Sequence, residues 1–156
     1  MSTRCQIEFK HSTKYNKRKK PQIERRTLYR HSDGYPEGVI PDLKAFLKWN
    51  SGRNDDIEYQ AANFIYWSKK GSEQYDKDNT PRYVLTGFGI CENDDFHGDI
   101  EYFYEVVRER IQEDGVSFKT TTKILVYTVE GKDYDHPIKR ENLRLIEEVE
   151  IPLREE

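Results

Sequence analysis

The spacing of apolar residues changes period twice along this chain, and this change limits the folds that the chain can adopt. Apolar and polar residues alternate over residues 3–10 and again over 83–130, the period of half-buried strands. Over residues 40–65 the apolar positions recur every three or four residues, the period of an amphipathic helix. We therefore predict an α+β fold of order ββααβββ, with a mostly antiparallel sheet of about five strands and two helices on one face.

The boundaries of the expected elements follow from turn and helix-end signals. Strands are expected at residues 3–10, 26–31, 83–90, 100–106 and 119–130. Pro41 is the expected start of the first helix, and Asp55 or Asp56 the expected cap of the second. Residues 141–153 fit a helix or an edge strand, and both interpretations stay open.

The length and composition predict one domain over residues 1–156. Hydrophobic residues make up 35% of the chain, but aromatic residues reach 13%, which disfavours disorder. Residues 11–24 are polar and fit neither period, so we expect a mobile basic loop there.

The same composition excludes several classes of protein. The chain has no apolar run long enough to span a membrane, and its start lacks the apolar stretch of a secretory signal, so we expect a cytoplasmic protein without a membrane partner. Cys5 and Cys91 are too far apart for a CxxC pair or a zinc knuckle, and we expect two free thiols, with a Cys5–Cys91 disulfide as the alternative.

Charge is distributed unevenly along the chain. Residues 1–30 contain ten Lys or Arg against two Glu, whereas residues 31–156 contain 16 basic and 27 acidic residues. The basic run from Lys14 to Lys20, with Tyr15, fits either a solvated loop or a weak nucleic-acid contact. The acidic remainder fits a surface that binds a basic host protein.

One polar cluster surrounds the turn His31-Ser32-Asp33-Gly34-Tyr35-Pro36-Glu37-Gly38, where the residue types demand tight turns and a positive φ. The candidate ligand-binding residues are Arg4, Arg30, His31, Asp33 and Tyr35. Arginine and histidine beside a helix N-terminus suit an anion such as phosphate. The alternative is that these side chains only stabilise the turn.

A second polar cluster lies in the loop Asp94-Asp95-Phe96-His97-Gly98-Asp99. Its Asp95, His97 and Asp99 are candidate ligands for a divalent metal, because carboxylates and imidazole are common metal ligands. The spacing is not that of an EF-hand, and a plain hairpin loop is the alternative.

No established catalytic motif unites these clusters. The chain lacks a GxSxG elbow, a Walker loop and a Rossmann fingerprint. His11-Ser12-Thr13 has the His-x-Thr form of two-histidine phosphoesterases, but a second copy is missing. A hydrolase could use His31 and His97 as acid and base across a shared cleft, and sequence does not show whether they meet.

The start Thr3-Arg4, its alternating strand, and the segment Tyr29-Arg30-His31-Ser32-Asp33-Gly34-Tyr35-Pro36 together resemble a family of short uncharacterised phage and bacterial proteins. The resemblance covers roughly the first 45 residues, and it implies an accessory role in a phage or mobile element. We expect a binding protein for an anionic, nucleotide-like ligand rather than an enzyme. The alternatives are a metal-dependent phosphate-ester hydrolase and an acidic inhibitor of a host factor.

Overall fold

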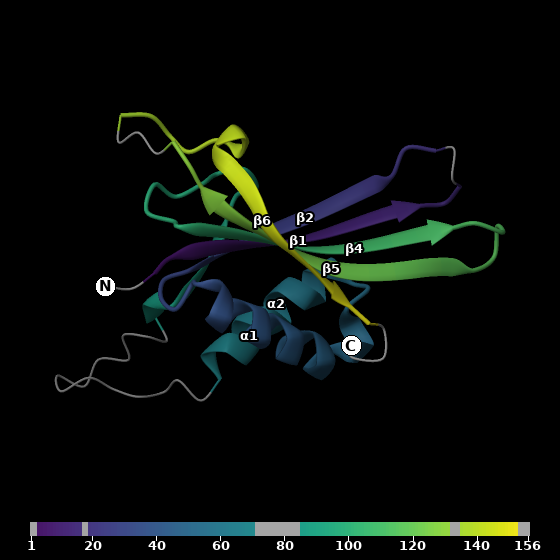
Figure 1. Cartoon of the computed structure of the whole chain (residues 1–156). Helices are drawn as coiled ribbons and strands as arrows, with labels where there is room; N and C mark the ends of the chain where they lie inside the picture. The colour runs from purple at the N-terminus through teal and green to yellow at the C-terminus, as the bar shows by residue number, and fades with distance from the viewer. Residues whose placement is uncertain (1–2, 17–18, 71–84, 132–134, 153–156) are drawn as a thin grey trace.

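The computed structural model describes residues 3–16, 19–70, 85–131 and 135–152, and these build a six-stranded mixed sheet with two helices (Figure 1). The strand order is β3-β2-β1-β4-β5-β6. The strands are β1 (Cys5–Lys14), β2 (Gln22–Arg30), β3 (Phe88–Cys91), β4 (Tyr102–Gln112), β5 (Phe118–Val129) and β6 (Leu143–Ile151). The helices are α1 (Pro36–Trp49) and α2 (Ile57–Lys69), joined through the short 3₁₀ turn η1 (Ser51–Arg53).

The sheet differs from the expected one in its central pairing and its number of strands. All neighbouring strands are antiparallel except β1 and β4, which run parallel with Cys5 opposite Tyr102. The sixth strand, β6, resolves the ambiguous segment near the end of the chain: Leu143–Ile151 pairs with β5, with a bulge opposite Val126 and Tyr127. The α+β class is confirmed.

The first hairpin is longer than its residue pattern indicates. We expected a connection over 11–24, but β1 continues to Lys14 and pairs through Thr13 opposite Gln22. His11 is only 4% exposed, and its ring nitrogen Nε2 lies 2.7 Å from the amide oxygen Oε1 of Gln60 on α2. The strand therefore continues through His11, a polar residue that can be buried because it has a hydrogen-bond partner, at a position where alternation predicts an apolar residue.

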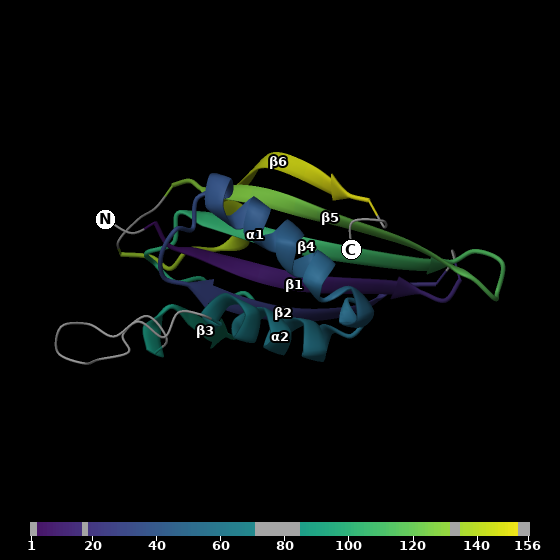
Figure 2. The ribbon, with the colours of Figure 1, turned by 90° about the horizontal axis from the view of Figure 1, so that it is seen from below.

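Both helices pack on one face of the sheet, as expected, and Figure 2 shows them lying across it. The main core between the layers includes Phe9, Phe46 and Phe64, whose rings contact one another at centroid distances of 5.0 to 6.0 Å. The first helix begins at Pro36 rather than at Pro41, which lies within the helix at an exposed position. Proline is favoured at the first helical position because it needs no N–H partner there.

The third strand is shorter than predicted and begins at Phe88. Part of the expected strand over 83–90 lies outside the described residues, as does the polar segment over 72–81 that precedes it. Neither described helix is long and apolar enough to cross a membrane.

The face of the sheet opposite the helices carries a second apolar cluster. It consists of Phe96, Ile100, Phe103 and Ile138, with Tyr29 and Tyr127 packed against it. The described parts of two connections therefore cover this face: residues 92–101, between β3 and β4, and residues 135–142, between β5 and β6. Figure 1 places both at the end of the sheet where the N-terminus lies.

Charged side chains attach these two connections to the sheet. Glu8 on β1 is 1% exposed and accepts two hydrogen bonds from Arg25 at 3.0 Å and one from Arg140 at 3.0 Å. Asp94 accepts from both arginines at 2.7 Å, and Arg140 also donates to Glu105 at 3.2 Å. We call these five residues the arginine–carboxylate network. Each carboxylate in it has a cationic partner, as buried charge requires.

Candidate functional site

The turn after β2 places its side chains through close backbone packing. Asp33 has φ of 55°, as the turn chemistry predicted, and the Gly34 N–H donates to the Thr3 carbonyl at 2.9 Å. A Cβ on Gly34 would lie 2.9 Å from the Cys5 Cβ, so only glycine fits there. The hydroxyl of Tyr104 donates to the Gly34 carbonyl at 2.7 Å. These contacts hold the segment after β2 against the start of β1.

The alternation of the strands then sorts the neighbouring side chains between the two faces. Cys5 and Leu28 belong to the main core on the helix side. Arg4 precedes Cys5, Tyr29 follows Leu28, and His31 lies two residues after Tyr29. These three side chains therefore lie on the opposite face of the sheet. Because Cys5 pairs with Arg30, Arg4 and His31 lie one step beyond this pair on neighbouring strands.

Gln6 attaches the loop over residues 92–101 to the same face. Its side-chain amide nitrogen donates to the Asp95 carbonyl at 2.9 Å, and its amide oxygen accepts from the His97 N–H at 2.9 Å. The Glu101 N–H donates to the Arg4 carbonyl at 2.9 Å. The loop is therefore anchored on both sides of His97 and Asp99.

These segments bring four side chains together around Tyr29. Its ring stacks on the His97 imidazole, with centroids 4.5 Å apart, and lies 6.1 Å from the His31 imidazole. Its hydroxyl donates to the Asp99 carboxylate at 3.1 Å and lies 3.4 Å from the His31 Nδ1. The Arg4 Nε lies 3.4 Å from both the His31 Nδ1 and the Asp99 carboxylate. We call Arg4, Tyr29, His31, His97 and Asp99 the Tyr29 cluster.

Burial and charge shift the acidity of two groups in or beside this cluster. Burial, reinforced by the Asp99 carboxylate, raises the pKa of the Tyr29 hydroxyl to about 12. Burial also raises the pKa of the Cys91 thiol, whose Sγ lies 3.6 Å from the His97 Nε2. Both groups are therefore protonated at neutral pH.

The structure separates the residues that the sequence grouped at the turn. Arg4 and His31 belong to the Tyr29 cluster. Arg30 faces the helices, where it is 7% exposed and donates to the Ser32 carbonyl and to Asp42, both at 2.9 Å. Asp33 and Tyr35 contact each other, with the Tyr35 hydroxyl 3.5 Å from the Asp33 carboxylate. Arg30 therefore stabilises the turn and the start of α1, and does not join His31.

The loop that carried the metal prediction contributes to the same cluster. His97 and Asp99 approach Tyr29, whereas Asp95 contacts Gln6 through its backbone carbonyl. Among the described residues, no three His, Cys, Asp or Glu side chains are grouped so that they could hold a metal ion. Sequence reasoning missed Tyr29, although its position two residues before His31 places both on one face of a strand.

Other sequence candidates lie apart from this cluster. Cys5 and Cys91 are both free thiols, as expected. Of the basic run from Lys14 to Lys20, residues 17 and 18 lie outside the described residues, and Tyr15 packs edge-on against Phe118 with centroids 5.9 Å apart. The run's contact with nucleic acid stays a prediction.

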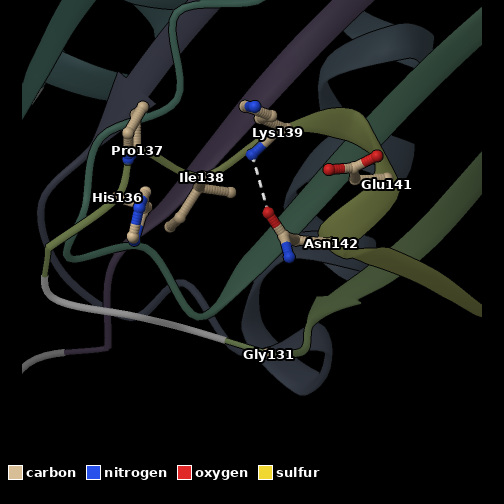
Figure 3. Close-up of a pocket in the computed structure, with 7 residues that line it drawn as sticks. All are labelled: Gly131, His136, Pro137, Ile138, Lys139, Glu141 and Asn142. Carbon is tan, nitrogen blue, oxygen red and sulfur yellow. Dashed lines mark hydrogen bonds between the residues drawn. The ribbon is translucent and has the colours of Figure 1, made fainter.

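A cavity of about 210 Å³ lies in the connection between β5 and β6 (Figure 3). Its lining residues are Gly131, His136, Pro137, Ile138, Lys139, Glu141 and Asn142. Within it, the Lys139 N–H donates to the Asn142 side-chain oxygen at 2.8 Å. The lining comes from this one connection and includes no member of the Tyr29 cluster.

The chain matches no family model, no curated protein and no solved structure. The geometry of the Tyr29 cluster is therefore the basis for a functional proposal.

Proposed function

We propose that the protein binds a phosphate-bearing, nucleotide-like ligand at the Tyr29 cluster. The observation that carries this proposal is the convergence of the cluster from three separate parts of the chain. Arg4 precedes β1, Tyr29 and His31 lie at the end of β2, and His97 and Asp99 come from the loop before β4. All five lie on the face opposite the main core, where Tyr29 also packs against the second apolar cluster.

The chemistry of the cluster suits a phosphate. Arg4 carries a permanent positive charge on a planar fork of donors, which matches phosphate oxygens. Its side chain is 36% exposed, and its contacts with His31 and Asp99 are long, at 3.4 Å. A phosphate oxygen can replace these contacts with shorter hydrogen bonds. The two imidazoles supply further donors, and the rings of Tyr29 and His97 supply aromatic surface for a base.

This proposal moves the binding site from the one expected at the turn. Arg30 is occupied by Ser32 and Asp42 on the helix side, and Tyr29 and His97 take its place beside His31. Asp33 and Tyr35 are left as turn residues. An accessory role in a phage or mobile element is the context that we propose for such a binding protein.

Calorimetric titration of the purified protein with AMP, and separately with inorganic phosphate, tests the proposal. We expect AMP to bind and Arg4→Ala to weaken it about tenfold or more, the effect of losing one charge-assisted hydrogen bond. Arg144→Ala is the matched control, because Arg144 is an exposed arginine on β6 that pairs with Glu130 at 3.1 Å. Absence of binding to either compound, or equal weakening by the two variants, would overturn the proposal.

A second candidate function has support from the acidic edge of the sheet. Among the described strands β6 pairs only with β5, so it forms an edge of the sheet, and Glu147, Glu148 and Glu150 along it are exposed. This edge suits a basic protein partner, in line with the expected host-factor inhibitor. We expect a partner retained from a host lysate at low salt to be lost with Glu147→Lys and Glu150→Lys combined. If the double variant still retains the partner, the β6 edge is not the binding surface.

A further inference from the structure

We infer that the Tyr29 cluster cleaves RNA by acid–base catalysis, with His31 as the base and His97 as the acid. The inference rests on the proposed binding of a phosphate-bearing ligand at this cluster. It is carried by the placement of the two imidazoles, which contact the same phenol ring from two different segments of the chain.

The hydrogen bonds of His31 favour the role of base. The Nε–H of Arg4 can only donate, and it points at the Nδ1 of His31, so this nitrogen accepts and carries no proton. The Tyr29 hydroxyl lies at the same 3.4 Å from Nδ1. A substrate phosphate that draws Arg4 away from His31 would leave the Nδ1 lone pair free to accept from a substrate hydroxyl, while Tyr29 keeps its hydrogen bond to Asp99.

The position of His97 favours the role of acid. Its imidazole is stacked on Tyr29 and exposed to solvent, so it can take up a proton from water and deliver it to a leaving group. The groups that face it are the Tyr29 ring and the Cys91 thiol, and those that face His31 are Arg4, Tyr29 and, through them, Asp99. The raised pKa of Cys91 keeps this thiol protonated and therefore a poor competing nucleophile.

RNA is the substrate class that two imidazoles and one guanidinium can process, because it carries its own nucleophile. The ribose 2′-oxygen attacks the adjacent phosphorus while its proton passes to His31, and the bond from phosphorus to the 5′-oxygen breaks. That oxygen takes a proton from the imidazolium of His97. The products are a 2′,3′-cyclic phosphate and a free 5′-hydroxyl, and Arg4 neutralises the charge that develops on the phosphoryl oxygens.

The test uses a DNA oligonucleotide that contains a single ribonucleotide, labelled at both ends and incubated with the full chain in EDTA. We expect cleavage at the ribonucleotide with a cyclic-phosphate end. His31→Ala and His97→Ala should each reduce the rate by about 100-fold or more, the usual contribution of a general acid or base. The matched control is His136→Ala, which removes an exposed histidine from the connection between β5 and β6. Thermal unfolding of every variant verifies that it is folded.

A second variant separates a chemical role for His97 from a structural one. In His97→Gly, added imidazole should restore cleavage, because free imidazole can occupy the vacated space and donate the proton. Binding of the all-deoxy oligonucleotide, which cannot be cleaved this way, is measured in parallel. Binding without cyclic-phosphate product would overturn this inference and leave the proposed function standing, whereas absence of binding would overturn both. Cleavage unaffected by either histidine variant would also overturn it, because the activity would then belong elsewhere.

Discussion

The phenol ring of Tyr29 and the imidazole of His97 stack with centroids 4.5 Å apart and planes inclined by 20°. Tyr29 belongs to β2, whereas His97 belongs to the loop from β3 to β4, which passes over β2 and β1 and is held at β1 by Gln6. The contact therefore joins the sheet to the loop and brings the two histidines of the site into one cluster.

The raised pKa of Tyr29 predicts a loss of stability at high pH. The hydroxyl ionises near pH 10 in the unfolded chain and at about 12 in the folded protein, so folding opposes its ionisation. The stability that it contributes is complete below pH 10 and is lost as the pH rises towards 12. In Tyr29→Phe, the free energy of unfolding measured with urea should decline less steeply between these two pH values. An unchanged decline would contradict the assigned environment of Tyr29.

Substitution of Asp99 tests the environment of the same hydroxyl independently. Its carboxylate accepts from the Tyr29 hydroxyl at 3.1 Å and disfavours the phenolate. Asp99→Asn should therefore lower the pKa of Tyr29, measured as phenolate absorbance after subtraction of the Tyr29→Phe spectrum. Asp114→Asn serves as control, because that carboxylate accepts from the Val116 and Ser117 backbone in another loop.

A methyl group at position 34 should destabilise the fold. The Cβ of Gly34→Ala would lie 2.9 Å from both the Cys5 Cβ and the Thr3 carbonyl oxygen, so strand and turn must separate. We expect a loss of about 1 to 3 kcal/mol in the free energy of unfolding, typical of overpacking. Gly52→Ala, where nothing lies within 4 Å of the new Cβ, should change stability far less. Equal effects of the two substitutions would contradict the close packing described for the turn.

Removal of Glu8 should be costly because two arginines share its carboxylate. Glu8→Ala leaves Arg25 and Arg140 without their common buried acceptor, and we expect a loss on the order of 2 kcal/mol. Glu148→Ala breaks an exposed pair with Lys123 and should cost less than about 1 kcal/mol. Hydrogen exchange should also accelerate in both connections that the arginine–carboxylate network holds. Stability equal to that of Glu148→Ala would show that the network contributes little.

His11 should make the protein sensitive to acid. Burial lowers its pKa below 6.5, although the hydrogen bond with Gln60 opposes this shift and Arg108 assists it. The unfolded chain therefore binds the proton first, and stability is lost as the pH falls from 6.5 through the lower folded pKa. Urea unfolding at several pH values should show a weaker acid dependence in His11→Gln. His136→Gln, at an exposed position, should retain the full dependence.

Helices and strands with a clear apolar period were predictable from the sequence, but the residues at which they begin and end were predicted less well. The apolar stripe of α1 is visible in the sequence, but two prolines are compatible with its start, and the helix begins at Pro36 rather than at the predicted Pro41. The end of β1 was missed because His11 is buried with a polar partner rather than among apolar side chains. Neither feature changes the period of the sequence, so periodicity could not reveal it.

The Tyr29 cluster shows why only part of the site was predictable. Arg4, His31, His97 and Asp99 were all selected as candidates, because their chemistry is visible in the residues themselves. Their proximity depends on the parallel pairing of β1 with β4, a contact between distant parts of the chain that no local pattern encodes. Arg30 was assigned to the same group as His31, but neighbouring residues of a strand point to opposite faces.

The parallel pairing has a consequence for how the molecule is made. β1 leaves the ribosome long before β4, yet Cys5 lies opposite Tyr102 and the strand is bonded on both sides along its length. Until β4 is synthesised, the nascent hairpin of β1 and β2 presents an open backbone edge in what becomes the middle of the sheet. Pairing across such a separation is slow. Premature association of nascent chains at this edge is the hazard that the topology creates, and β4 removes it.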